Sequence, residues 1–316
     1  MGLTTEEINS AIEHQLDTWP LARDNFFKLM ETVRKTLQLG DMQCSVQLNP
    51  ARIISTGARI DQKSIESRPC FLCRANRPDE QEPVGWRNSQ LDDWELLINP
   101  FPILPVHFTV AHKSHRPQDT IPLEMAIMAE EAEDLVFFFN GAHAGASAPD
   151  HLHAQAVLKQ ELPLMRLVEK HHLPGNRAVF FSDECGLNLP YHFISLIITP
   201  DENGMRLLAK VPYAYGIDAT TKTNDAGLVN AYFWIDTRSY LRIVIVPRKS
   251  HRPSCYGNTP SDFMISPGAI DMAGLMISVR REDFDRIDAK TARKIYDDVA
   301  FSESIPDYVK SPFNGF

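Results

Sequence analysis

The chain opens with apolar residues at helical spacing. Residues 4–7 read Thr-Thr-Glu-Glu, which has the form of a capping box at the start of a helix. Four apolar residues then share one helical face before Gly40 ends the helix, namely Phe26, Met30, Val33 and Leu37. The pattern predicts a helical N-terminal segment, residues 1–67.

After a polar, proline-rich stretch at residues 68–87, short apolar runs alternate with turns. Strands are predicted at residues 94–98 and 106–110. A helix is predicted at residues 123–135, because a proline precedes it and its acidic residues can form a solvated face. Residues 151–158 again have strand character, so the chain is predicted to contain both strands and helices.

One short repeat is present. Residues 113–117 read Lys-Ser-His-Arg-Pro, and the same five residues recur at 249–253, each time directly after an apolar, strand-like run. A match of five residues can arise by chance, but the shared context favours two related lobes. Only the first copy is followed by a cluster of histidines, so the second lobe is expected to be a degenerate partner.

Composition narrows the function classes. The 316 residues carry a net charge of -9, which disfavours a broad nucleic-acid surface but allows a local basic pocket for a small anion. No apolar run approaches the roughly 20 residues of a membrane helix, and the first residues do not resemble a leader peptide. Five cysteines, an odd number, fit free thiols or a metal site better than a disulfide framework. We therefore expect a cytoplasmic protein without nucleic-acid or membrane partners.

The most informative segment joins a small-residue loop to a strand. Residues 140–150 are small and turn-forming, so their backbone N–H groups can approach an anion closely. In the strand that follows, side chains alternate between faces, which points His151, His153 and Gln155 the same way. Apolar residues on the other face can pack into the core and hold this polar row rigidly.

Three chemical interpretations of the polar row are open. A neutral imidazole can attack phosphorus and form a covalent nucleotidyl-histidine, while the Gln155 amide and Ser147 hold phosphate oxygens. A metal site with an HxH pair normally takes a carboxylate ligand soon afterwards, and residues 154–158 contain none. The third interpretation is structural, with both histidines satisfied inside a polar strand. We favour the first.

The segment GASAPDHLHAQ resembles the HxHxQ signature of the nucleotidyltransferase and phosphorylase branch of the histidine-triad superfamily. This branch includes galactose-1-phosphate uridylyltransferase, diadenosine tetraphosphate phosphorylase and GDP-L-galactose phosphorylase, of which the last is most similar. INPFPILPVHFTVAHKSHRPQ upstream and SPGAIDMAGLMISVRREDFD downstream extend the resemblance over most of residues 95–305. It implies an α+β fold, a histidine-triad-like antiparallel sheet with flanking helices, in two lobes at residues 68–200 and 201–316.

The resemblance also implies roles for individual residues. His153 would be the nucleophile, His151 would orient it or bind metal, and Gln155 would contact the transferred phosphate. Phosphate-loop positions of the family match Asn140, Gly145, Ala146 and Ser147. The hydrolases of the superfamily have a third histidine at the position of Gln155. In the family, a glutamine there is found in enzymes that catalyse transfer or phosphorolysis in preference to hydrolysis. A glutamine is no general acid, so the leaving group must depart without a proton from it.

A metal site is a further implication. Cys70 and Cys73 form a lone CxxC, which by itself is a weak zinc signal. In the uridylyltransferase a CxxC, a later histidine and the first histidine of HxH bind zinc, and these positions map onto Cys70, Cys73, His115 and His151. His112 is an alternative to His115, and two free thiols are an alternative to structural zinc. No organic cofactor is implied.

Several further residues are weaker candidates for nucleotide binding. Six residues could supply positive charge or hydrogen bonds to a nucleotide, although each could equally be solvated surface, namely His107, Lys113, Arg116, Arg248, Lys249 and Arg252. His171 and His172 are expected in a surface loop.

The expected reaction is a double displacement at a nucleotide α-phosphorus. A GDP-sugar is the expected donor, and inorganic phosphate or a sugar phosphate is the expected second substrate. A nucleotide-binding protein without turnover and a metal-dependent hydrolase remain the alternatives. The sequence does not specify an oligomeric state.

Overall fold

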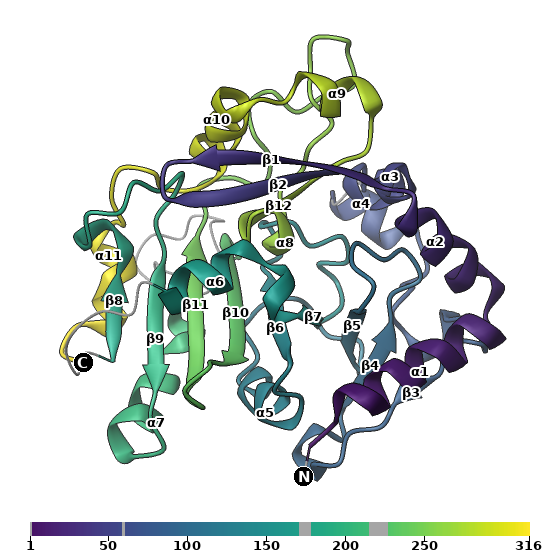
Figure 1. The fold of residues 1–316 in the computed structure, drawn as a ribbon. Helices are drawn as coiled ribbons and strands as arrows, with labels where there is room; N and C mark the ends of the chain where they lie inside the picture. The colour runs from purple at the N-terminus through teal and green to yellow at the C-terminus, as the bar shows by residue number, and fades with distance from the viewer. Residues whose placement is uncertain (1, 59–60, 171–177, 215–226) are drawn as a thin grey trace.

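A nine-stranded antiparallel sheet forms the centre of the molecule in a computed structural model, which describes residues 2–58, 61–170, 178–214 and 227–316. The loop predicted to contain His171 and His172 lies outside the described residues. Figure 1 shows most strands of the large sheet side by side. In sheet order the strands are β3 (Pro83–Val84), β4 (Trp94–Ile98), β5 (His107–His112), β7 (His153–Leu158), β6 (Leu135–Asn140), β10 (Val229–Ile235), β11 (Leu241–Pro247), β9 (Ile194–Ile198) and β8 (Val179–Phe181).

The strands predicted in the first half are confirmed in type, with shifted ends. β4 coincides with residues 94–98, and the strand predicted at 106–110 is β5, which runs to His112. The helix predicted at 123–135 is the shorter α5 (Glu124–Glu131), because the apolar run from Leu135 continues as strand β6. Six consecutive residues of β6 are buried, which is typical of a central strand covered on both faces.

The predicted N-terminal helix is correct only in its first part. Helix α1 (Thr5–Thr18) has the expected capping box, and α2 (Pro20–Met30) follows it. The continuation of the helix to Leu37 is wrong, because residues 33–39 form strand β1 (Val33–Leu39), paired with β2 (Met42–Leu48). Leu37 and Leu39 lie at strand spacing on the inward face, and Gly40, with a φ of 65°, makes the tight turn instead of a helix end.

A second, smaller sheet covers one end of the large one. It consists of β1, β2 and β12 (Leu275–Ser278), which runs parallel to β2. Figure 1 shows β1 and β2 crossing above the upper ends of the central strands, with α9 and α10 beyond them. The remaining helices are α3 (Ile53–Thr56), α4 (Gln62–Glu66), α6 (Pro163–Lys170), α7 (Glu202–Leu208), α8 (Ala269–Met272), α9 (Arg281–Arg286), α10 (Ala289–Val299) and α11 (Asp307–Lys310).

Each face of the large sheet has its own core. Ile8 of α1, Met125 of α5 and Leu207 of α7 pack on the face that carries Phe137 and Phe139. Residues of the small sheet and of α6, α8 and α10 pack on the face that carries Phe138. This mixed α+β architecture, an antiparallel sheet with flanking helices, confirms the predicted fold class. In the described residues no helix has both the length and the apolar character needed to cross a membrane.

The order of strands places two halves around the central β6–β10 pair. Outward from that pair lie β7, β5 and β4 on one side and β11, β9 and β8 on the other, so β4–β7 and β8–β11 occupy matching positions. The repeated pentapeptide does not follow this relation, because it follows β5 in one half and β11 in the other. The sheet also continues across residue 200, since β9 pairs with β11. The domain boundaries remain a prediction.

Candidate active site and metal cluster

One edge of the large sheet gathers the residues that the sequence singled out. Neighbouring strands are antiparallel, so β5, β6 and β11 all end at the edge where β7 begins. The small-residue loop at 141–152 crosses this edge between β6 and β7, and both pentapeptide copies leave it. Segments more than 100 residues apart in sequence therefore meet here.

His153 begins β7 with its ring oriented by the backbone. The His153 side chain is 4% exposed, and its Nδ1 lies 2.7 Å from the carbonyl oxygen of His151. Because that carbonyl can only accept, Nδ1 carries the proton and Nε2 is left with a lone pair. Among the described residues Nε2 has no hydrogen-bond partner. Burial lowers the pKa of His153 to about 4, so the ring is neutral at neutral pH.

Gln118 fixes the backbone around His153. Its amide accepts from the His153 N–H at 2.8 Å and donates to the carbonyl oxygens of His153 and Asn140 at 2.9 and 2.8 Å. The side chain is 1% exposed, so water does not compete for these bonds. Gln118 thus joins the end of β6 to the start of β7 where the sheet opens for the loop.

Gln155 lies two residues further on the same face of β7 and lines a cavity. The cavity comprises about 660 Å³ of unfilled space, part of it open to solvent. His107, which is buried on the neighbouring strand β5, lies with Nε2 2.8 Å from the Gln155 side-chain oxygen. His153 itself does not line this cavity; it lies beside it, about 7 Å along the strand from Gln155.

The predicted phosphate-loop residues all line the cavity: Asn140, Gly145, Ala146 and Ser147. Gly145 has a φ of 97°, and a Cβ there would lie 2.4 Å from the Gly268 Cα. Only glycine therefore lets the loop approach α8 this closely. The backbone N–H of Gly145 points at Nδ1 of His251, 3.4 Å away.

A second part of the cavity wall comes from segments far from the HxHxQ motif. Arg52, His251 and Arg252 line it together with Asp271. Burial lowers the pKa of Arg52 to about 10 and that of His251 to about 4, so Arg52 is charged and His251 neutral at neutral pH. Burial raises the pKa of Asp271 to about 6, and its two oxygens accept from the backbone N–H groups of Gly268 and Ile277.

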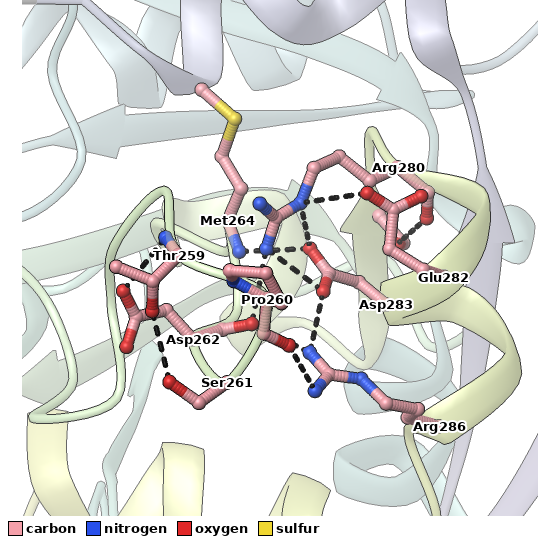
Figure 2. Close-up of polar contacts among 10 residues, drawn as sticks. Thr259, Pro260, Ser261, Asp262, Met264, Arg280, Glu282, Asp283 and Arg286 are labelled. Atoms are coloured by element: carbon pink, nitrogen blue, oxygen red, sulfur yellow. Dashed lines mark hydrogen bonds and ion pairs between the residues drawn. The ribbon is translucent and has the colours of Figure 1, made fainter.

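An ion-pair network holds the segment that leads into this wall. Figure 2 shows Asp283 between Arg280 and Arg286, with the loop at 259–264 beside them. The fully buried Asp283 carboxylate accepts from Arg280 Nε at 2.7 Å, from Arg286 Nη2 at 2.9 Å and from the Met264 N–H at 2.9 Å. Because two guanidinium groups compensate the buried charge, the loop is tied firmly to α9.

The predicted arginines and lysines divide into three groups. Arg252 lines the cavity, with its guanidinium group donating to Ala58 O and Ser266 Oγ. The structure does not bring Lys113, Arg116 or Lys249 to the cavity, and all three are exposed. Arg248 is buried but bonded to Asn230, Pro267 O, Ser250 O, His251 O and Val299 O, so it acts on the site only through its neighbours.

The four residues proposed as metal ligands lie together. Cys70, Cys73, His115 and His151 place their ligand atoms within 4.8 Å of one another. Cys70 Sγ and His151 Nδ1 are 3.3 Å apart, as are Cys73 Sγ and His115 Nδ1. A tetrahedral ion with Zn–S of about 2.3 Å and Zn–N of about 2.0 Å separates such atoms by about 3.6 Å. The Cys2His2 cluster therefore fits a metal ion.

The surroundings of His112 show why His115 is the better candidate for the fourth metal ligand. The His112 ring packs edge-on against Trp94 and its Nδ1 accepts from the Ser114 N–H, so it points away from the sulfur atoms. The His112 carbonyl oxygen lies 2.7 Å from His151 Nε2. That contact leaves His151 Nδ1 as the atom available to a metal.

His151 does not reach the cavity. Its side chain is fully buried, with one ring nitrogen at the sulfur atoms and the other at the His112 carbonyl. It orients His153 through its own carbonyl oxygen, so the cluster and the candidate nucleophile are joined by one residue.

Sequence reasoning missed several residues of the site, namely Gln118, Asn230, Arg52, His251 and Asp271. Gln118 directly follows the first pentapeptide, and His251 is the histidine of the second, so the repeat was a signal for both. Arg52 carried no signal, because only the packing of the N-terminal segment against the sheet brings it to the cavity.

Three comparisons set this chain beside known proteins. A family model described as a domain of unknown function, DUF4922, matches residues 11–158. A search of curated proteins finds no match. Among solved structures, yeast Ap4A phosphorylase Apa2 matches with a TM-score of 0.57 and 17% identity, covering 89% of this chain and 96% of that one.

Two ligand complexes of the same yeast enzyme also match. The complex with Ap4A has a TM-score of 0.57 and 16% identity, covering 89% of this chain and 96% of that one. The complex with AMP has a TM-score of 0.52 and 16% identity, covering 91% and 96%. The chain has the fold of this phosphorylase. At such low identity the likeness shows the fold alone.

Proposed function

We propose that the protein transfers a nucleoside monophosphate group through a covalent bond to His153. The observation that carries this proposal is the His153 ring: Nδ1 is bonded to the His151 carbonyl, and Nε2 has no partner among the described residues. An imidazole held in one tautomer beside a cavity rich in hydrogen-bond donors is suited to attack phosphorus.

The reaction has two displacements. Nε2 of His153 forms a bond to the α-phosphorus, and the bond from that phosphorus to the bridging oxygen breaks, so the leaving group departs with the electron pair. The Nδ1 proton stays in place, and the His151 carbonyl stabilises the positive charge that develops on the ring. An oxygen of inorganic phosphate then attacks the same phosphorus, the N–P bond breaks, and neutral His153 is regenerated.

A nucleoside diphosphate sugar is the proposed donor, and a GDP-hexose is the first choice because of the sequence resemblance. The products would be a sugar 1-phosphate and a nucleoside diphosphate. A dinucleoside polyphosphate is the second candidate donor, because the structures of the yeast enzyme that match this chain include its complexes with Ap4A and with AMP. Both donors place a nucleoside monophosphate on His153.

We also propose structural zinc at the Cys2His2 cluster. Two thiols and two imidazoles suit zinc and leave no open position for a substrate. The ion would tie the segment at 70–73 to the start of β7, and His151 would transmit this restraint to His153. No step of the transfer passes through the metal.

The test is to trap the intermediate. The wild-type protein, incubated with GDP-hexose or Ap4A labelled at the α-phosphorus, is expected to form an acid-labile adduct that inorganic phosphate discharges. His153→Ala is expected to form no adduct and to lose at least about a thousandfold in rate. His143→Ala is the matched control, because His143 is an exposed histidine of the same loop.

Each rival predicts a different result. Binding of nucleotides without phosphate-dependent cleavage would favour a nucleotide-binding protein. Hydrolysis that stops on chelation, without any adduct, would favour a metal-dependent hydrolase. Turnover at the wild-type rate in His153→Ala would overturn the proposal.

A further inference from the structure

Two side-chain amides face the cavity, Gln155 from β7 and Asn140 from the end of β6. In each, the side-chain oxygen is already occupied: Gln155 Oε1 by His107, and Asn140 Oδ1 by Asn230 and the Ala269 N–H. We infer that two buried relays lock both amides with their NH2 groups toward the cavity, which makes it selective for phosphate. His107, Asn230 and Arg248 are then positioning residues.

The first relay begins at the backbone of Ile103. Its N–H donates to Nδ1 of His107 at 3.1 Å, so Nδ1 must be unprotonated. The proton of neutral His107 therefore sits on Nε2, which donates to the Gln155 oxygen at 2.8 Å. Burial and the nearby charge of Arg52 lower the pKa of His107 to about 3, so the ring stays in this tautomer. The Gln155 NH2 group is left for the cavity.

The second relay comes from the other half of the chain. Arg248, which can only donate, bonds the Asn230 oxygen at 2.7 Å. The Asn230 NH2 group must then face the other way, where it donates to Asn140 Oδ1 at 3.2 Å and to Ala144 O at 2.8 Å. The Ala269 N–H donates to the same Asn140 oxygen at 2.6 Å. Asn140 thus also offers its NH2 group.

Neither NH2 group has a hydrogen-bond partner among the described residues. An inward oxygen would repel a phosphate, whereas two inward NH2 groups can donate to it without any reorganisation. Among the described residues that line the cavity, Asp271 is the acidic one, and both its oxygens are occupied by backbone N–H groups. The inference rests on the proposed function and deepens it, because it names the residues that orient the two amides expected at the transferred phosphate.

Phosphate binding gives a test that does not require turnover. The probes are GMP and inorganic pyrophosphate, with guanosine as the probe that lacks phosphate, and affinity is measured by calorimetry. His107→Met removes the donor to Gln155 and is expected to weaken GMP and pyrophosphate binding by about ten- to a hundredfold, with guanosine unchanged. His107→Gln restores a donor at the same reach and is expected to recover most of the affinity.

Two controls separate positioning from damage to the fold. Thr109→Val alters the residue directly opposite Gln155 on β5. It removes the hydroxyl that accepts from Asn99 at 3.1 Å but neither contact of the relay, and it should bind GMP as the wild type does. In a Gln155→Ala background, His107→Met should cause no further loss of GMP affinity. Equal loss in both backgrounds, or equal loss of guanosine binding, would overturn the first relay.

Asn230→Asp tests the second relay, because it is isosteric and keeps the Arg248 contact but removes the donor to Asn140. We expect GMP and pyrophosphate affinity to fall by about tenfold or more. Unchanged affinity would overturn this relay. Failure of the relays can be distinguished from failure of the proposed function. If phosphate binding depends on the relays but no adduct forms, the proposed function is rejected and the relays stand. If the adduct forms and neither His107→Met nor Asn230→Asp affects it, the relays are rejected and the proposed function stands.

Discussion

The two copies of Lys-Ser-His-Arg-Pro have the same sequence and leave the same edge of the large sheet, yet they have different surroundings. In the first copy, His115 joins the Cys2His2 cluster and Arg116 is exposed. In the second, His251 and Arg252 both line the cavity. The same five residues thus place one histidine in a Cys2His2 cluster, and another histidine with its arginine on the wall of the cavity.

The difference lies in what each copy faces. The first copy follows β5, one strand beyond β7, and meets the thiols of residues 70 and 73. The second copy follows β11, beyond β10, and meets the small-residue loop at Gly145. The role of a short motif is therefore set by the strand order and by the segment packed against it.

The largest effect is expected when the histidine of each copy is replaced by alanine in turn. His115→Ala removes a ligand of the cluster, so we expect loss of bound zinc and a decrease in unfolding free energy of several kcal/mol, about 10 °C or more in Tm. His251→Ala should keep the zinc content of the wild type. Elemental analysis and thermal unfolding with and without a chelator check both variants. Equal metal content in His115→Ala and the wild type would break the comparison.

The two arginines should differ in binding. Arg252→Gln removes a positive charge from the cavity wall, and we expect GMP affinity to fall by about tenfold. Arg116→Gln changes an exposed residue and should alter that affinity by less than about twofold. Calorimetric titration of both variants measures the difference. Similar losses in both variants would mean that Arg116 also reaches the ligand.

Local patterns predicted what depends on nearest neighbours in the chain. Strand alternation placed Gln155 and His153 on one face of β7, and small residues located the loop that lines the cavity. The resemblance brought together the four cluster residues, which the structure indeed places side by side. The polar row and the loop depend on one strand and its neighbour in the chain, so residue spacing carries them, whereas the cluster joins three segments and was predicted from the resemblance alone.

Apart from this cluster, features that depend on distant segments were not predicted. Residues 33–39 have apolar positions at both helical and strand spacing, and only pairing with β2 selects the strand. Arg52 and Asn230 reach the site because the N-terminal segment and β10 pack against β6. Lys113 and Arg116 were expected at the substrate because of their charge, but charge does not specify which way a turn faces.

Acid should weaken the fold through the histidine of the second copy. The pKa of His251 is lowered to about 4 by burial, with Arg252, Arg248 and His143 facing it, and that of His107 to about 3, with Arg52 facing it. Below about pH 6.5 these histidines are protonated in the unfolded chain but still neutral in the folded one. The free energy of unfolding therefore falls by about 1 kcal/mol per pH unit for each ring.

Asp271 opposes this trend. Its pKa is raised to about 6, so the folded state gains a proton before the unfolded state does, and acidification between about pH 6 and 4 is stabilising through this group. Three histidines with lowered pKa values, His251, His107 and His153, outweigh one carboxyl, so we expect the urea midpoint to fall between pH 7 and 5. His251→Asn should make that fall shallower. A midpoint that rises over this range would contradict the expected balance.

The smallest effect is expected where the two copies are alike. Lys113 and Lys249 occupy the same position of the pentapeptide, both are exposed, and neither lines the cavity. Lys113→Ala and Lys249→Ala should each change unfolding free energy by less than about 0.5 kcal/mol, because neither removes a buried contact. Both should change GMP affinity by less than about twofold, measured at low ionic strength, where a long-range contribution would be largest. A clear loss in Lys249→Ala alone would show that the second copy acts on the ligand with its lysine as well as with His251 and Arg252.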